Sequence, residues 1–128
     1  MRLNPLSAVL AVALLGCTAP AEASSCRALD GDTYICRGER IRLENVDAPE
    51  LHARCDAELE AARAARAFAQ AALDGAREIK IEVGRRARDR YGRTLAHVLV
   101  DGKDLGELLI GVGLARPYHG ERRRGWCN

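Results

Sequence analysis

The cysteines constrain the fold of this chain more than any other feature of its sequence. The 128 residues include five cysteines, and setting aside Cys17, which lies in the apolar N-terminal segment, leaves Cys26, Cys36, Cys55 and Cys127. An even number of cysteines in a small chain that is exported indicates disulfides rather than free thiols. Four cysteines allow three pairings, so the sequence count alone leaves the connectivity open.

Local geometry favours one of these pairings. Cys26 and Cys36 lie symmetrically about Gly31, so two antiparallel strands joined at the Asp-Gly turn would place the two cysteines opposite each other. Cys55 is then left to pair with Cys127, which would hold the C-terminus against the middle of the chain. In the loop-entropy model the two bridges stabilise the fold by roughly 3 and 4 kcal/mol, the longer loop giving more.

The N-terminus is typical of a secretory signal peptide. Arg2 is followed by the uncharged stretch 6–15, rich in Ala, Val and Leu, which is shorter than the roughly 20 residues that span a bilayer. The triplet Ala-Glu-Ala that ends at Ala23 fits a cleavage site. We therefore predict a signal peptide 1–23 and a mature domain 24–128.

A second processing route is equally visible in the same segment. Leu-Leu-Gly-Cys at 14–17 resembles a bacterial lipobox, in which cleavage follows residue 16 and Cys17 carries lipid. Either route predicts an exported protein, periplasmic or secreted, and only the second attaches it to a membrane.

The remaining pattern predicts one α+β domain. After the proposed cleavage, 128 − 23 leaves 105 residues, enough for a single core. Alternating apolar residues, turn dipeptides and helix formers predict strands at 27–30, 33–36, 40–46, 79–83 and 95–100, with helices at 56–73 and 105–112.

Net charge says less about partners than its distribution does. A net charge of +2 is too small to indicate nucleic acid binding by itself. Two basic clusters could nevertheless attract a polyanion, although such runs are often only solvated loops. The clusters are Arg85, Arg86, Arg88, Arg90 and Arg93 in one connection and Arg116, Arg122, Arg123 and Arg124 near the C-terminus.

Acids and arginines recur in three short segments. Asp32 stands in LDGDTY, Arg42, Asp47 and Glu50 stand in IRLENVDAPE, and Arg93 stands in DRYGR. Carboxylates can hold a hard cation and arginines can clamp a phosphate, so the set suits metal-dependent phosphodiester chemistry.

The order DGDT, R-x-x-x-x-D-x-P-E and D-x-Y-G-R resembles the staphylococcal nuclease (thermonuclease) family, in register from about residue 27 to about residue 118. The resemblance implies an OB-type five-stranded β-barrel with flanking α-helices. It also implies calcium-dependent cleavage of DNA and RNA, single-stranded or frayed, with little sequence preference and with 3′-phosphates as products. The enzyme would act as a monomer without an obligate protein partner.

The same resemblance implies roles for individual residues. Asp32, Asp47 and the main-chain carbonyl of Ala48 would bind Ca²⁺; Ala48 replaces a threonine of the family, but alanine supplies the same carbonyl. Glu50 would be the general base. Arg42 and Arg93 would bind the scissile phosphate, and the three residues Arg90, Tyr91 and Tyr118 would contact the nucleotide.

The chain departs from the family in two places. The loop after Glu50 is shorter, and the family's final helix has no counterpart after Tyr118, where the tail instead ends near Cys127.

Two alternatives to a nuclease stay open. One is a non-catalytic OB-like module of the cell envelope that binds nucleic acid or protein, and the other is an envelope scaffold whose arginines meet anionic lipid or glycan. The presence of Glu50 favours the nuclease, because a protein that only binds phosphate has no need of a carboxylate beside it.

Overall fold

A computed structural model describes Gly16 and residues 25–127. The predicted signal peptide, apart from Gly16, and Cys17 of the lipobox lie outside the described residues. The predicted order of strands and helices is confirmed, but the single strand predicted at 40–46 is wrong: Asn45 has a left-handed backbone (φ 61°), so one strand ends at Leu43 and a separate short strand begins at Val46. Two further two-residue strands lie at Lys103–Asp104 and Arg116–Pro117. The elements are β1 (Cys26–Ala28), β2 (Thr33–Cys36), β3 (Glu39–Leu43), β4 (Val46–Asp47), α1 (Asp56–Gly75), β5 (Ile79–Arg88), β6 (Thr94–Val100), β7 (Lys103–Asp104), α2 (Leu105–Gly111) and β8 (Arg116–Pro117).

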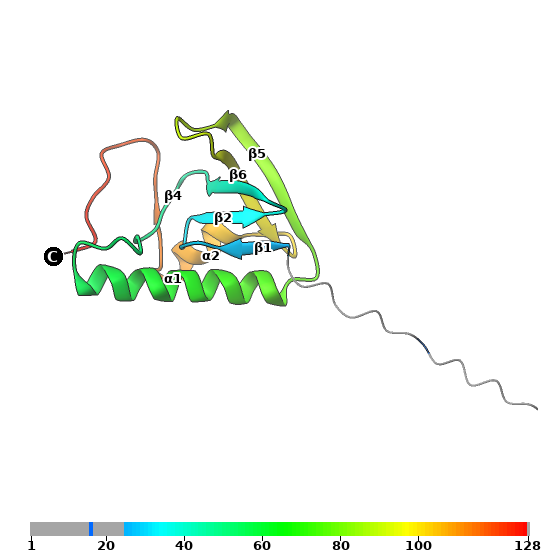
Figure 1. The fold of residues 1–128 in the computed structure, drawn as a ribbon, viewed down its shortest axis with the longest axis horizontal. Helices are drawn as coiled ribbons and strands as arrows, with labels where there is room; N and C mark the ends of the chain where they lie inside the picture. The colour runs from blue at the N-terminus through cyan, green and yellow to red at the C-terminus, as the bar shows by residue number, and fades with distance from the viewer. Residues whose placement is uncertain (1–15, 17–24, 128) are drawn as a thin grey trace, which may run out of the picture.

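The main sheet joins two antiparallel units through one parallel ladder. Its strands follow the order β1-β2-β3-β6-β5, with β7 on β6, and the short β4 and β8 form a second ladder. β3 and β6 run parallel, so the chain has to cross over between them. The crossover contains α1, which lies along one edge of the sheet in Figure 1. This is the α+β, OB-like architecture that the sequence predicts, and the ladders among the described residues leave β1 and β5 at the two ends.

Two hairpins turn on residues with left-handed backbone. Arg37 (φ 51°) and Gly38 (φ 80°) join β2 to β3, while Asp101 (φ 49°) and Gly102 (φ 80°) join β6 to β7. Positive φ at both central residues is the type I′ turn, whose twist matches that of paired strands. The Asp101 carboxylate also accepts two backbone N–H bonds of 2.9 Å from the segment after α1, so the turn fixes the end of the crossover.

Strand β5 is longer than predicted. The alternation of Ile and Val ends at Val83, but the backbone stays paired with β6 as far as Arg88, with a register shift between these two residues. Arg85, Arg86 and Arg88 therefore lie on a strand rather than in a loop. The apolar pattern missed this extension because backbone ladder bonds do not require alternating apolar side chains.

The core lies between the sheet and the two helices. Tyr34 and Ile41 of the sheet, Leu73 of α1 and Leu105 and Leu109 of α2 are its largest side chains, each at most 1% exposed. Burial of one such side chain contributes about 1.5–3 kcal/mol. The core thus holds α1 against the strands that carry the charged residues.

Gly31 lies where three segments meet. A Cβ atom built on it would lie 2.7 Å from Cβ of Ala48 and 2.9 Å from Cβ of Ala65 in α1. Both contacts are closer than real Cβ atoms tolerate, so glycine is required here for steric reasons.

Both predicted cysteine pairs form disulfides. Cys26 and Cys36 are register partners on β1 and β2, with Cα atoms 4.0 Å apart. Cys55 and Cys127 are separated by 72 residues in sequence and join the C-terminal tail to the start of α1, where the tail ends in Figure 1. Neither helix among the described residues combines the length and apolar character needed to span a membrane.

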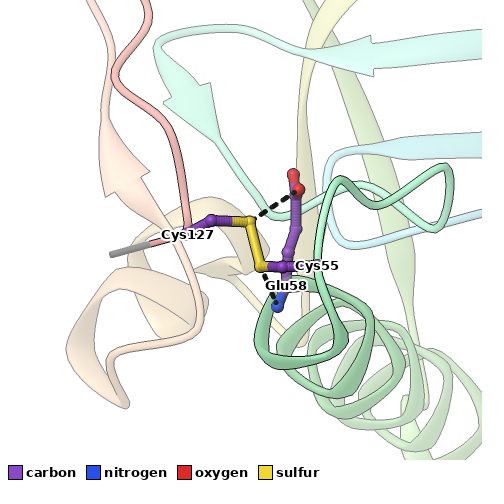
Figure 2. Close-up of side chains that lie close together, drawn as sticks. All are labelled: Cys55, Glu58 and Cys127. Carbon is purple, nitrogen blue, oxygen red and sulfur yellow. Dashed lines mark hydrogen bonds between the residues drawn. A yellow bond between two sulfur atoms is a disulfide. The ribbon is translucent and has the colours of Figure 1, made fainter.

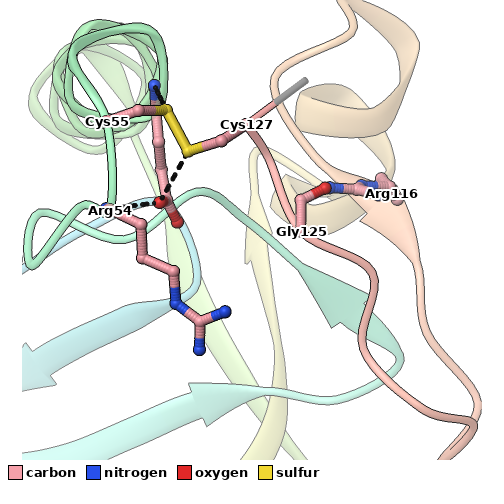
Figure 3. The surroundings of a disulfide bond; sticks show 6 residues. Arg54, Cys55, Arg116, Gly125 and Cys127 are labelled. Carbon is pink, nitrogen blue, oxygen red and sulfur yellow. Dashed lines mark hydrogen bonds between the residues drawn. A yellow bond between two sulfur atoms is a disulfide. The ribbon is translucent and has the colours of Figure 1, made fainter.

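The long-range disulfide also caps α1. The backbone N–H of Glu58 lies 3.4 Å from Sγ of Cys55, and the Glu58 carboxylate accepts a 2.8 Å bond from the backbone N–H of Arg54 (Figures 2 and 3). This arrangement resembles a capping box in which a cysteine replaces serine or threonine.

Replacing Gly31 with alanine should destabilise the fold by about 1–3 kcal/mol, because the added methyl group clashes with two rigid neighbours. Urea denaturation of Gly31→Ala measures the effect. Gly111→Ala is the matched control, since no atom other than its chain neighbours and the backbone of its own helix lies within 4 Å of the Cβ position at Gly111. An equally stable Gly31→Ala variant would contradict the steric argument.

Replacing Cys55 and Cys127 together with serine should lower the free energy of unfolding by roughly 4 kcal/mol, and replacing Cys26 and Cys36 by roughly 3 kcal/mol. Denaturation of the oxidised variants tests both values. Unchanged unfolding midpoints would show that the bridges do not contribute in this way.

Candidate functional site

Asp32 is held in a tight loop between β1 and β2. Its backbone N–H donates to the Asp30 carboxylate at 3.1 Å, and the Tyr34 hydroxyl donates to the Gly31 carbonyl at 2.5 Å. The Asp32 carboxylate accepts bonds from the Thr33 hydroxyl at 3.2 Å and from the Ala48 backbone N–H at 2.8 Å. The loop therefore points a buried carboxylate at the segment that follows β4.

Arg42 of β3 lies against Asp32. The β2–β3 register pairs Thr33 with Arg42, which brings Nη2 of Arg42 within 3.4 Å of Oδ2 of Asp32. Nη1 donates 2.7 Å bonds to the carbonyls of Leu43 and Val46. Because both carbonyls belong to the backbone, the guanidinium is fixed in place before any ligand arrives.

Burial dominates the electrostatics of Asp32. Removal from water raises the pKa of Asp32 from 3.8 to about 6, although the Arg42 charge and the bond from Ala48 act in the opposite direction. Arg42 and the Ala48 N–H therefore do not fully compensate the burial of the ionised carboxylate. A bound cation would stabilise that ionised form.

Arg93 reaches the same place through the parallel ladder. The register pairs Arg42 with Leu95, so the β5–β6 turn delivers Arg93 beside β3. Nε of Arg93 donates a 2.6 Å bond to Asp89. Partial burial acts to raise the pKa of Asp89, but the bonds from Arg93 and Tyr91 outweigh it and lower the pKa below its usual value, so Asp89 stays charged and orients Arg93.

Tyr91 covers this turn as an exposed ring. The guanidinium of Arg90 lies 4.9 Å from the ring centroid and that of Arg93 lies 5.3 Å from it. Arg90 also donates to the Tyr91 hydroxyl at 2.7 Å. Arginine and aromatic groups together suit a phosphorylated ligand with a planar base.

Asp47 and Glu50 come from β4 and the loop after it. Asp47 is only 4% exposed, whereas the side chain of Glu50 is 48% exposed. Both carboxylates bond the same side chain, Arg123 of the C-terminal tail: Nε donates to Asp47 at 2.8 Å, Nη2 also donates to Asp47, and Nη1 donates to Glu50 at 3.0 Å. The sequence had indicated Arg123 only as part of a basic cluster.

These segments enclose a cleft of about 410 Å³. Five of the predicted site residues line it: Asp32, Arg42, Glu50, Tyr91 and Arg93. Four further residues that the sequence did not assign to the site complete its wall: Asp30, Thr33, Arg40 and Arg123. With four arginines against three carboxylates, the wall suits an anion.

The other predicted residues do not line this cleft. Asp47 is joined to it through Arg123, and Ala48 is completely buried behind Asp32. Arg90 stacks on Tyr91, while Tyr118 is placed by the bond from its backbone N–H to Asn45 at 2.9 Å. The roles predicted for all of these residues stay predictions.

The donor set fits a hard divalent cation. Asp32 and Asp47 supply two buried carboxylates, and Ca²⁺ prefers oxygen ligands of this kind together with carbonyls and water. The carbonyl of Ala48 stays a predicted third ligand. Asp32, Asp47 and Ala48 thus stay the residues predicted to hold the ion.

A second cluster of potential ligands is not a metal site. One ligand atom each from Cys55, Glu58 and Cys127 lies within 4.8 Å of the others (Figure 2). The two sulfurs form a disulfide and offer no thiolate. For the same reason the 3.6 Å contact between Sγ of Cys127 and Glu58 has no proton on the sulfur to donate.

The fold and the cleft together define an OB-like α+β domain whose cleft is rich in arginine. A family model described as "Staphylococcal nuclease homologue" matches residues 40–125. The chain belongs to the staphylococcal nuclease family, as the order of its motifs predicts.

Several relatives are similar over the same region. The chain is 36% identical over 94 residues to a thermonuclease of Staphylococcus intermedius, covering 70% of this chain and 55% of that protein. It is 36% identical over 95 residues to endonuclease YncB of Bacillus subtilis (70% and 44%) and 36% identical over 92 residues to the succinoglycan biosynthesis protein ExoI of Rhizobium meliloti (68% and 47%). The chain thus spans about half the length of these relatives.

The raised pKa of Asp32 predicts how stability depends on pH. Unfolded Asp32 ionises near its usual pKa of 3.8 and folded Asp32 only near 6, so its contribution to stability is present at low pH and is lost as pH rises between these values. From about pH 4 to about pH 7, the stability of the wild type relative to Asp32→Asn should fall by on the order of 3 kcal/mol.

Urea denaturation of both proteins in EGTA measures this difference. Asp74→Asn, at an exposed position near the end of α1, is the control and should show no such trend. A constant difference between wild type and Asp32→Asn across this range would contradict the assignment.

Proposed function

We propose that this chain is an exported, calcium-dependent nuclease that hydrolyses phosphodiester bonds of DNA and RNA with little sequence preference. The observation that carries the proposal is the convergence of Asp32, Arg42, Glu50 and Arg93 from three separate segments on one cleft. Family membership and the relatives named thermonuclease and endonuclease support it.

The roles of the arginines follow from their fixed geometry. Arg42 is held by two backbone carbonyls and Arg93 by Asp89, so both guanidinium groups are oriented before the substrate binds. A guanidinium stays charged at any working pH and offers paired N–H donors to phosphate oxygens. Such donors bind more strongly as negative charge develops on the phosphate, which lowers the barrier to attack.

Glu50 is the proposed general base. Its carboxylate lies on the wall of the cleft and is half exposed, so water can reach it. An ionised carboxylate can accept a proton from water as the water attacks phosphorus in line with the leaving oxygen. Calcium, when bound at Asp32 and Asp47, would supply positive charge that stabilises the attacked phosphate.

Two disulfides support export, because such bonds persist in oxidising compartments. We propose a periplasmic or secreted location, with membrane attachment only if Cys17 is lipidated. The exposed Tyr91 ring suits an unpaired base, which supports a preference for single-stranded or frayed substrate. Arg90 and Tyr118 are proposed to contribute to nucleotide binding.

Replacing Glu50 with glutamine should reduce cleavage by about 10²–10⁴-fold while leaving nucleic acid binding in place, because the amide cannot accept the proton. Hydrolysis of labelled single-stranded DNA and RNA is measured with calcium and with EGTA, and binding by fluorescence anisotropy. Glu60→Gln on the exposed surface of α1 is the matched control.

Three results would refute parts of the proposal. Cleavage that persists in excess EGTA would exclude calcium dependence. A Glu50→Gln variant as active as Glu60→Gln would remove Glu50 as the base. Binding without any cleavage by the folded wild type would favour the alternative of a non-catalytic binding module.

A further inference from the structure

Arg123 contacts two of the predicted site residues, although no motif of the sequence assigns it a role. Its guanidinium bonds Asp47, a predicted cation ligand, through Nε at 2.8 Å and through Nη2. The same group bonds Glu50, the proposed base, through Nη1 at 3.0 Å. One side chain from the tail therefore contacts both carboxylates on which the proposed chemistry depends.

The contact with Asp47 satisfies a strong electrostatic requirement. The Asp47 side chain is 5% exposed, and a carboxylate so removed from water needs a compensating positive charge. Among residues 25–127, Arg123 is the cation that forms an ion pair with Asp47. Partial burial acts to lower the pKa of Arg123, but its bonds to Asp47 and Glu50 outweigh this and raise it, so the guanidinium stays charged.

A guanidinium and a divalent cation compete for this carboxylate, because both are attracted to its negative charge and repel each other. The oxygen that accepts both Arg123 bonds, Oδ1 of Asp47, is one of the oxygens a cation would use. Two positive groups that need the same oxygen bind competitively, and each weakens the apparent affinity of the other.

The surroundings of Arg123 offer it a second partner. Arg123 lines the cleft with Arg42 and Arg93, and it also lines an adjoining hollow of about 250 Å³ with Arg124 and Trp126. A phosphate bound between Arg42 and Arg93 would lie within the same cleft as the Arg123 guanidinium. Arginine forms paired bonds with phosphate as readily as with carboxylate.

The tail cannot carry Arg123 far from the cleft. Cys127 follows four residues later and is bonded to Cys55. The Cα atoms of Arg123 and Cys127 can therefore lie at most about 14 Å apart, the length of four residues of extended chain. Nη2 of Arg116 donates a 2.9 Å bond to the Gly125 carbonyl (Figure 3), and the Arg116 guanidinium stacks 3.6 Å from the centroid of the Trp126 ring. The disulfide and the Arg116 contacts therefore keep Arg123 close to the cleft whichever partner it binds.

We propose that Arg123 is a third phosphate-binding arginine of the cleft, held by Asp47 and Glu50 until a divalent cation binds Asp47. The inference rests on the proposed function, because it assumes that the cleft binds both a cation and a phosphate. It assigns the C-terminal tail a part in substrate binding. It also makes cation binding and phosphate binding mutually favourable.

The test compares Arg123→Gln with Arg122→Gln by calorimetry. Arg122 is an exposed neighbour that lines neither hollow. Its replacement changes the net charge by the same amount as Arg123→Gln but leaves the cleft unaltered. The probes are Ca²⁺ alone, and a nucleoside 3′,5′-bisphosphate in saturating Ca²⁺, which has no phosphodiester bond to cleave. Thermal unfolding verifies that each variant folds.

Arg123→Gln should bind Ca²⁺ alone about fivefold tighter than wild type, and should bind the bisphosphate about fivefold or more weakly. Arg122→Gln should stay within about twofold on both probes, because exposed charges are screened. If Arg123→Gln does not fold, Arg123→Lys replaces it; lysine lacks the paired fork and should shift both affinities in the same directions by less.

Unchanged Ca²⁺ affinity in Arg123→Gln would overturn the competition, and unchanged bisphosphate affinity would overturn the phosphate role. Equal shifts in both variants would reduce the effect to net charge and also overturn the inference. In each of these cases the wild type still binds Ca²⁺ and the bisphosphate, so the proposed function is not affected. A wild type that binds neither probe would instead refute the proposed function on which the inference depends.

Discussion

The parallel ladder between β3 and β6 is the constraint on which the site depends. It pairs Arg42 with Leu95, and so brings the turn that carries Arg93 beside the central strand on which Arg42 lies. A parallel pair requires a long crossover, and α1 with its buried alanines is the longest element in it. The same helix passes close to Gly31, so the ladder, the helix and the Asp32 loop are positioned together.

Burial of charge is the second organising feature. Asp32, Arg42 and Asp47 are each less than 9% exposed, although charged groups are seldom buried without partners. Arg42 is compensated by two carbonyls and by Asp32, whereas Asp32 keeps a raised pKa. The ionised form of Asp32 is therefore disfavoured by its burial, and a ligand of opposite charge would stabilise it.

The tail contributes to both stability and electrostatics. The Cys55–Cys127 disulfide closes a long loop and caps α1, and the four residues before Cys127 begin with the arginine that bonds Asp47 and Glu50. This covalent bond keeps the short segment before Cys127 beside the cleft. Stability and site geometry are thus linked through one bond.

The sequence by itself determined the order of elements, the cysteine pairing and the kinds of side chain in the cleft. These properties depend on local preferences, on symmetry about a turn, or on chemistry that a residue has wherever it lies. Motif order also identified the family. The end of β5 was missed, because backbone pairing beyond Val83 leaves no apolar pattern to read.

Only the tertiary structure decided how these parts meet. The parallel direction of β3 and β6, the shielding of Asp32 and the contact of Arg123 with Asp47, 76 residues away, all depend on the path of the whole chain. A run of arginines near a terminus reads as a solvated cluster until the fold shows which of them reaches a buried carboxylate. Sequence patterns report local conformation, whereas desolvation and long-range ion pairing exist only once the chain has closed around them.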